Sequence, residues 1–321
     1  MSITFVSYAA ETSFVAYLHY LDDIANVIGG LFGRDVGGVY ASMRLHPPLR
    51  ALPPADLSPD TMQRVAGALA QAWNHLGLID NAIEPANYDQ QANAVVPGLV
   101  MSAVTAAARA LALALGAGEP VSPDDALSFL GDLTTEELFP YPWSAHCFGC
   151  PQLGSADWGG SVLPGESVSV FSAPNPGTSD ARFAMLLRTT RQRALERAFA
   201  VARQTDVRPG RTRRNLTVEH KEALAASIAP TTLFDVLDRV ARRVESDDGE
   251  AFIHGAFDDE EALQFATTLA AVGDASLAAI ESVLATIIGW DLFADLAASH
   301  ARQRAVGAAA RRAHAAAAIW R

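Results

Sequence analysis

The sequence of 321 residues lacks several features that define particular protein classes. Its two cysteines are too few for a disulfide scaffold. The first residues carry no basic segment ahead of an apolar run, which argues against a signal peptide. The pattern contains no heptad, collagen or solenoid repeat. We therefore expect a cytoplasmic protein with both cysteines reduced.

Charged residues are also scarce, since they make up 19% of the chain while hydrophobic residues make up 50%. That much apolar surface excludes a disordered chain. The longest apolar stretch, Ala92 to Ala117, is rich in small residues and contains Arg109, so we interpret it as a buried helix and expect no membrane span. Lys221 is the only lysine, and this arginine bias is typical of a bacterial-type, GC-rich genome.

Helical periodicity dominates what is present. Apolar residues recur at three- and four-residue steps, and two Ser-Pro-Asp triplets, beginning at Ser58 and Ser122, are typical helix starts. No alternation of strands and helices occurs, which excludes Rossmann and P-loop folds. The expected helices span residues 9–31, 59–79, 92–116, 123–138, 180–205, 217–228, 231–247, 258–272, 274–289 and 291–318.

One segment, residues 139–179, breaks this pattern with many Pro and Gly residues. Within it, Ser167 to Phe171 alternates in a way that is typical of a short strand. We predict an all-α fold with two helical-bundle halves, residues 1–138 and 180–321. A long, Gly/Pro-rich and mostly irregular segment, either an ordered loop or a linker, would join them.

Positive charge is concentrated in one short stretch of an acidic chain. The net charge is −12, made up of −13 in residues 1–181, +8 in residues 182–221 and −7 in residues 222–321. Arginine side chains bind phosphate through two parallel hydrogen bonds, so Arg208, Arg211 and Arg213 are candidate ligand-binding residues. The alternative is that these arginines pair with the acidic parts of the chain. On the preceding helix, Arg188 and Arg191 would form one close pair, and Arg193 and Arg197 would share a face.

Arg214, Asn215 and His220 fit an R-N-x4-H pattern inside the same stretch. The pattern resembles the short Arg/His signature of HEPN-type helical domains, some of which cut RNA. The resemblance implies that these three residues are catalytic, with His220 handling a proton and Arg214 the phosphate charge. Thr217 is also a suitable N-cap, which would place His220 in the first turn of a helix. A solvent-exposed histidine in that turn is the alternative interpretation.

Asp22, Asp23 and Asn26 lie three or four residues apart and share one helical face. Oxygen ligands in this arrangement can hold Mg²⁺ for a diphosphate substrate. The pattern is similar to the aspartate motifs of head-to-head prenyl synthases and class I terpene cyclases, which are all-α enzymes of comparable length. The resemblance covers about seven residues and implies a Mg²⁺-dependent enzyme, although Asn26 stands where an acid is usual. A solvated acidic patch is the alternative.

His146 directly precedes Cys147 and Cys150, which form a C-x-x-C turn. Two sulfurs at this spacing can bind a metal such as Zn²⁺ or form a disulfide. A tetrahedral Zn²⁺ site would need a fourth ligand from elsewhere, because no second cysteine pair exists. The alternative is that both cysteines pack a loop as small apolar residues.

Three functions follow from these patterns. We favour a binding or interaction protein that engages a phosphate-bearing ligand, RNA or a nucleotide, through the Arg-rich residues 182–221. A prenyl-diphosphate-type enzyme and a metal or redox protein are the alternatives. A protein partner and a second copy of the chain are further partners that the sequence leaves open.

Overall fold

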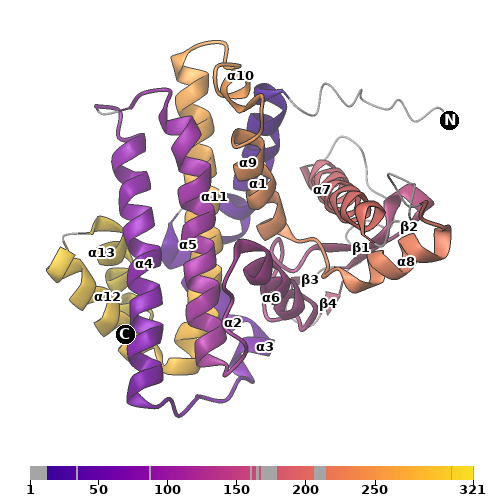
Figure 1. Ribbon diagram of the computed structural model, residues 1–321. Coiled ribbons are helices and arrows are strands. Elements are labelled where there is room, and N and C mark those ends of the chain that lie inside the picture. Colours follow the sequence, from indigo (N-terminus) through magenta and orange to yellow (C-terminus); the bar gives the residue numbers. More distant parts are fainter. Residues whose placement is uncertain are drawn as a thin grey trace. The chain divides into compact units, whose positions relative to one another are not determined.

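The computed structural model describes residues 13–33, 35–86, 88–159, 161–163, 166–167, 179–205, 215–304 and 306–320. Within them the fold is all-α, as predicted, with thirteen α-helices and four short strands (Figure 1). The helices are α1 (Phe14–Phe32), α2 (Val36–Leu45), α3 (Pro47–Arg50), α4 (Pro59–Ile83), α5 (Ala92–Ala114), α6 (Pro123–Thr135), α7 (Ser179–Gln204), α8 (Val218–Ser227), α9 (Leu233–Val244), α10 (Gly249–Ile253), α11 (Asp259–Ile288), α12 (Trp290–Arg304) and α13 (Gly307–Trp320). The strands are β1 (His146–Cys150), β2 (Ser155–Gly159), β3 (Ser161–Leu163) and β4 (Glu166–Ser167), and a 3-10 turn, η2, spans Pro151–Leu153.

The chain forms two compact units. Unit 1 combines residues 1–129 with residues 237–321, and unit 2 consists of residues 130–236. This division differs from the predicted boundaries at residues 138 and 179. Helices from both ends of the chain pack together in unit 1, whereas strands β1 and β2 pack with α7 and α8 in unit 2. The division falls within α6 and α9.

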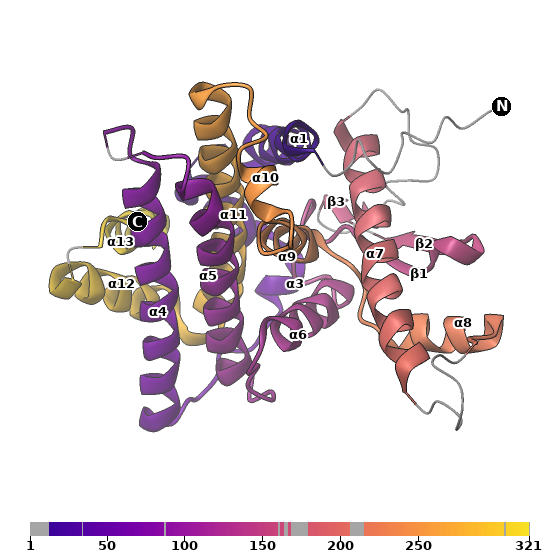
Figure 2. The same cartoon turned by 45° about the horizontal axis from the view of Figure 1, so that its top comes forward.

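Helix α11 is the centre of unit 1. It contacts α1, α2 and α5, and α5 in turn packs along α4. In Figures 1 and 2, α4, α5 and α11 run side by side. Buried residues lie on all sides of the middle of α11, from Ser276 to Ala285. A helix without a polar face is stable only in the interior, which explains this central position.

The predicted helix starts are confirmed by their hydrogen bonds. The Ser58 hydroxyl accepts from the Thr61 amide at 3.1 Å, ahead of α4. Ahead of α6, the Ser122 hydroxyl accepts from the Asp125 amide at 3.2 Å, and the Asp125 carboxylate accepts from the Ser122 amide at 3.0 Å. Each bond satisfies an amide that the helix itself leaves unpaired.

Two predicted divisions near the C-terminus are wrong. The helices expected at 258–272 and 274–289 are one helix, α11, which continues through Gly273. The single helix expected at 291–318 is instead divided into α12 and α13. Helix α11 ends at Gly289, whose φ of 94° favours glycine.

The glycine-rich segment after α1 forms a helix that the sequence did not predict. Asp35 caps α2 by accepting from the Gly38 amide at 2.8 Å. A Cβ atom on Gly38 would lie 1.7 Å from the Phe32 carbonyl oxygen, so this turn requires glycine. Glycine usually weakens a helix, but Gly38 is needed here because the backbone passes close to the Phe32 carbonyl oxygen.

The described part of residues 139–179 is more regular than predicted. Strands β1 and β2 form an antiparallel hairpin in which His146 pairs with Gly159 and Cys150 with Ser155. Strands β3 and β4 form a second antiparallel pair. Of the strand predicted at 167–171, only residue 167 lies within the described residues. The core of unit 2 includes Cys150, Leu195, Phe199 and Ala225, contributed by β1, α7 and α8.

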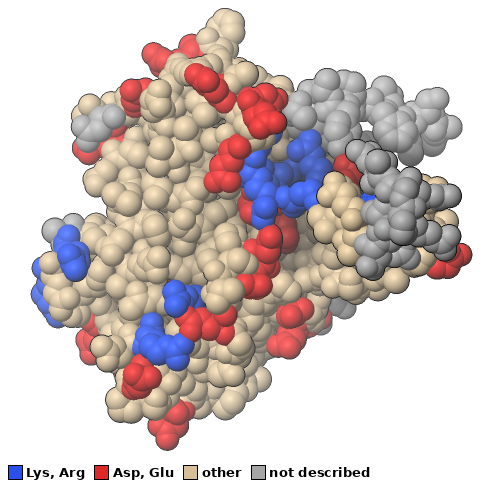
Figure 3. All heavy atoms as spheres, viewed as in Figure 1, with Lys and Arg blue, Asp and Glu red and all other residues tan. Residues whose placement is uncertain are grey.

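Two helices, α5 and α11, are long and apolar enough to cross a membrane by length and composition. Most of each apolar window is buried inside the protein, as expected for core helices. Figure 3 shows the face of the protein that includes α4 and α5, where a broad area carries few charged side chains.

Candidate functional site

A cavity with a volume of about 1140 Å³ lies in unit 1. It is formed by α2, α3, α11, α13 and the first residue of α12, and we refer to it as the α2–α13 cavity. Its basic side chains come from both ends of the chain and are Arg44, Arg50, Arg311 and His314. Its acidic side chains are Asp35 and Asp274.

Both carboxylates of the α2–α13 cavity already have internal partners. Asp35 caps α2 through the Gly38 amide. Asp274 accepts from Nη2 of Arg312 at 2.8 Å. The cavity is thus lined by three arginines and one histidine against two carboxylates, and both carboxylates have internal partners.

The basic side chains of the cavity differ in whether they form hydrogen bonds or ion pairs within the protein. Arg311 makes two hydrogen bonds to Asp80, at 3.0 and 3.1 Å. Arg44 donates to the carbonyl oxygen of Ile319 near the end of α13. Arg50 and His314 make no side-chain hydrogen bond or ion pair to any described residue, and both are exposed. These two side chains are the ones available to a ligand.

A buried polar cluster lies next to the α2–α13 cavity. Glu281 is fully buried on α11, and both of its oxygens accept from Nε of Arg312 at 2.7 Å. Tyr40 and Trp73 donate to the same carboxylate at 2.7 and 2.6 Å. Asp274 belongs both to this cluster and to the cavity wall, so the cluster fixes one side of the site.

Burial and charge shift the pKa values within this cluster. Burial raises the pKa of Glu281, against the opposing effect of Arg312 and the hydrogen bonds. Burial and the neighbouring Glu281 also hold the pKa of Tyr40 well above its ordinary value. For Arg312, burial favours a lower pKa, but Asp274 and Glu281 outweigh it and raise the pKa. Arg312 is therefore a permanent cation whose charge is balanced inside the protein.

The predicted Arg-rich stretch is only partly described. Arg208, Arg211, Arg213 and Arg214 lie outside the described residues, so their predicted roles stay predictions. On α7, Arg188, Arg197 and Arg203 are exposed and form no ion pair with a described residue.

Arg191 has a structural position that the sequence did not reveal. Its side chain is fully buried and donates to the carbonyl oxygens of Ala225, Ala229 and Gly149 at 2.7, 2.6 and 3.1 Å. It therefore caps the end of α8 and ties α8 to β1. The predicted pair of Arg188 and Arg191 is divided between two environments, because Arg188 is exposed and Arg191 is buried.

His220 and Asn215 are both exposed, and His220 takes part in a capping box. The predicted N-cap is confirmed, since the Thr217 hydroxyl accepts from the His220 amide at 3.3 Å. In return, Nδ1 of His220 accepts from the Thr217 amide at 3.4 Å. This explains His220 without catalysis, and the HEPN-like hypothesis stays a prediction because Arg214 is not described.

The three residues of the predicted Mg²⁺ motif on α1, Asp22, Asp23 and Asn26, have different surroundings. Asp22 accepts from Gln264 at 2.9 Å and from Thr268 at 3.1 Å, which joins α1 to α11. Asp23 is buried, whereas Asn26 is exposed and lines a separate cavity of about 430 Å³. The three side chains therefore do not face one common space.

His146, Cys147 and Cys150 belong to the β1–β2 hairpin. Both cysteines are buried and free, and Nδ1 of His146 lies 2.9 Å from the Ser144 carbonyl oxygen. Burial raises the pKa of Cys147 to about 12, against the opposing effect of Arg191 and Arg188. A thiol with so high a pKa is protonated at neutral pH and is a poor nucleophile.

Neither predicted metal site gains support from the described residues. Among them, no group of three or more His, Cys, Asp and Glu side chains is placed to hold a metal ion. The Mg²⁺ and Zn²⁺ hypotheses thus stay predictions from the sequence pattern.

No protein-family model, no curated protein and no solved structure matches the chain. The residues of the α2–α13 cavity are accordingly our only guide to its ligand. Sequence reasoning missed Arg44 and Arg50 because it expected no helix between residues 31 and 59, and it missed His314 because this residue lies on α13, far from α2 and α3 along the chain. Arg44 and Arg50 each lie in the last turn of a short helix, where basic residues are favoured. Their positions are the one sequence signal that could have indicated these two helices.

Proposed function

We propose that this protein is a binding protein for a small phosphate-bearing ligand, a nucleotide fitting best, and that the ligand binds in the α2–α13 cavity. The observation that supports this proposal is the excess of basic side chains around a cavity whose acidic groups are engaged internally. Arginine binds phosphate with good geometry, and among the described residues that line this cavity Arg50 is the arginine without an internal partner.

The size of the cavity and the charge of the chain both favour a small ligand. A volume of about 1140 Å³ is slightly larger than typical small-molecule sites, which occupy about 300–1000 Å³, so a small ligand fits inside it. A chain with a net charge of −12 repels a long polyanion over most of its surface. A nucleotide needs only one local cluster of arginines and avoids this repulsion.

The test is calorimetric titration of the full chain with ATP and with inorganic pyrophosphate at low and moderate salt. We expect binding that weakens as salt increases. Arg50→Glu should weaken binding at least about tenfold, which is about 1.4 kcal/mol. Arg302→Glu on α12 is the matched control, because Arg302 is exposed, does not line the cavity and changes the net charge equally.

Two results would contradict the proposal. One is the absence of binding of either probe at low salt. The other is an equal loss of affinity in the Arg50 and Arg302 variants, which would mean that only net charge matters.

A second candidate is binding of RNA by the Arg-rich residues 182–221, as the sequence predicts. The observation that favours it is the exposure of Arg197 and Arg203 on α7 without an ion-pair partner among the described residues. Fluorescence anisotropy with a single-stranded RNA separates the two candidates. Arg197→Glu combined with Arg203→Glu should abolish RNA binding here, while Arg50→Glu should leave it nearly unchanged.

A further inference from the structure

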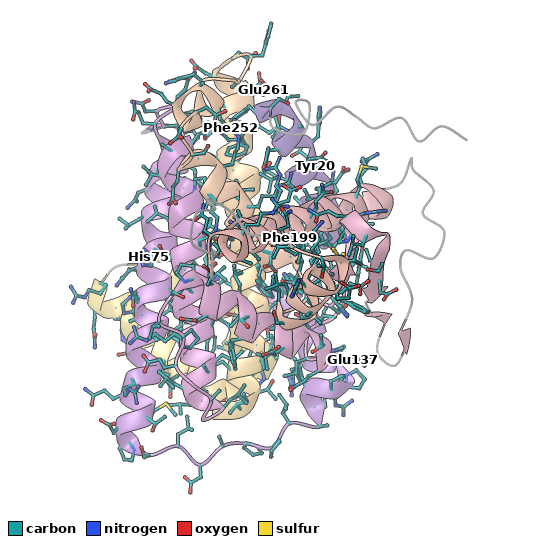
Figure 4. All side chains as sticks on the ribbon, turned by 45° about the vertical axis from the view of Figure 1, so that its right-hand side comes forward. Tyr20, His75, Glu137, Phe199, Phe252 and Glu261 are labelled. Atoms are coloured by element: carbon teal, nitrogen blue, oxygen red, sulfur yellow. The ribbon has the colours of Figure 1, made fainter. Side chains whose placement is uncertain are left out.

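A second cavity in unit 1 shares no lining residue with the α2–α13 cavity. Its volume is about 680 Å³, and it is formed by α4, α5, α9 and the turn before α6. We refer to it as the α5 cavity. The residue that matters most, His75, lies part-way along α4, where Figure 4 labels it.

Two polar atoms at the α5 cavity are buried and have no hydrogen-bond partner among the described residues. They are Nδ1 of His75 and the hydroxyl oxygen of Thr105. Buried polar groups in native proteins nearly always form hydrogen bonds, because leaving one unpaired costs free energy. Two such atoms lining the same cavity suggest that something in the cavity pairs with them.

Thr105 is unusual when it is compared with other helical threonines of this chain. Thr134, Thr190 and Thr267 each donate a hydrogen bond to the carbonyl four residues earlier, at 2.7 to 2.9 Å. That bond is the usual way in which a threonine in a helix satisfies its hydroxyl. Thr105 does not form it, so its hydroxyl is left for a partner outside the helix.

Most of the charged residues that line the α5 cavity form ion pairs, and Glu245 is the lining carboxylate without an ion pair to a described residue. Arg109 binds Glu119, and Arg242 binds both Asp238 and Asp124. Their charges are thus largely balanced within the protein. A charged ligand would have to compete with these ion pairs.

Apart from the exposed Glu245, the polar side chains that stay available are uncharged. Gln71 and Ser102 line the cavity and form no side-chain hydrogen bond to a described residue. His75 joins them, because burial lowers its pKa and keeps the imidazole neutral. A neutral imidazole, an amide and two hydroxyls can each donate and accept hydrogen bonds.

We propose that the α5 cavity binds an uncharged, hydroxyl-bearing small molecule such as a sugar or a nucleoside, held by His75 and Thr105. Hydroxyl groups both donate and accept, as these protein groups do, and they need no counter-charge. The proposal does not depend on the phosphate-binding function, because the two cavities have different residues.

The experiment combines ligand binding with the stability of one isosteric variant. Maltose and uridine are titrated into the full chain by calorimetry, with glucuronate and uridine monophosphate as charged counterparts. We expect at least one of the uncharged probes to bind more tightly than its charged counterpart. Thr105→Val should weaken that binding about tenfold or more, and Arg50→Glu should leave it unchanged.

Thr105→Val should weaken ligand binding but stabilise the unliganded protein. Thr105→Val removes an unpaired hydroxyl at constant shape, so it should raise the midpoint of thermal unfolding. The control is Thr134→Val, which loses the bond to Leu130 and should lower the midpoint.

The proposal is wrong if neither maltose nor uridine binds at 10 mM, since water would then be the only occupant. It is also wrong if the probes bind to the Thr105→Val variant as tightly as to the unsubstituted protein. Loss of pyrophosphate binding in Arg50→Glu, with uridine or maltose binding intact, would distinguish the two cavities.

Discussion

Two neighbouring arginines on α13 have very different surroundings. Arg312 is fully buried and is held by Glu281 and Asp274. Arg311 pairs with Asp80, but its side chain is 49% exposed and that of Asp80 is 37% exposed. Exposed ion pairs contribute little to stability, whereas removal of one member of a buried pair leaves an uncompensated charge in the interior.

We therefore predict losses of very different size for the same substitution at adjacent positions. Arg312→Met should lower the free energy of unfolding by about 3–5 kcal/mol, because Glu281 would stay buried without its cation. Arg311→Met should lower it by at most about 1 kcal/mol. Urea unfolding followed by tryptophan fluorescence measures both values. Equal losses in the two variants would contradict the structural role of the buried cluster.

Residue-scale features show where sequence reasoning works and where it fails. Thr217 could be recognised as an N-cap because capping depends on a few neighbouring residues. Arg191 could not be recognised as buried, because its acceptors on β1 and beyond α8 lie more than thirty positions away. The α2–α13 cavity was missed for the same reason, since Arg50 and His314 come from opposite ends of the chain.

At the scale of whole elements, the close packing of α11 against α5 depends on one glycine. A Cβ atom on Gly273 would lie 2.7 and 3.0 Å from the two methyl carbons of Val100. Sequence reasoning ended a helix at this glycine, because glycine weakens isolated helices. The long helices α4, α5 and α7 were predicted from their apolar residues, and the Ser58 cap marked the start of α4. What the pattern could not show was that two helices approach closely at Gly273.

Two glycine-to-alanine substitutions test this explanation. Gly273→Ala should lower the free energy of unfolding by about 1–3 kcal/mol, because the added methyl group overlaps Val100. Gly67→Ala on α4 should raise it by about 0.5–1 kcal/mol, since a Cβ there meets nothing within 4 Å and alanine favours the helix. Thermal unfolding monitored by circular dichroism gives both values. The Val100→Ala background should largely remove the penalty at Gly273, and a penalty that persisted there would point to another cause.

At the scale of the whole molecule, the chain leaves unit 1 through α6 and returns to it through α9. Unit 1 is held together by helices from both ends of the chain, with α11 at its centre. Unit 2 has its own small core and a polar tie, the buried Arg191, between β1 and the end of α8. Each unit therefore has an internal set of contacts that can be weakened separately.

Removal of the Arg191 side chain should loosen unit 2 alone. Arg191→Met leaves the carbonyl groups of Ala225, Ala229 and Gly149 without their donor, so we expect local opening to become easier by about 2–4 kcal/mol. Hydrogen exchange resolved by mass spectrometry should show roughly tenfold or faster exchange in β1 and α8. Helices α5 and α11 should keep their protection. Arg197→Met, at an exposed position of the same helix, is the control and should change neither region. Faster exchange throughout α5 and α11 in the Arg191 variant would mean that the two units unfold as one, and the division of the chain would then have no energetic counterpart.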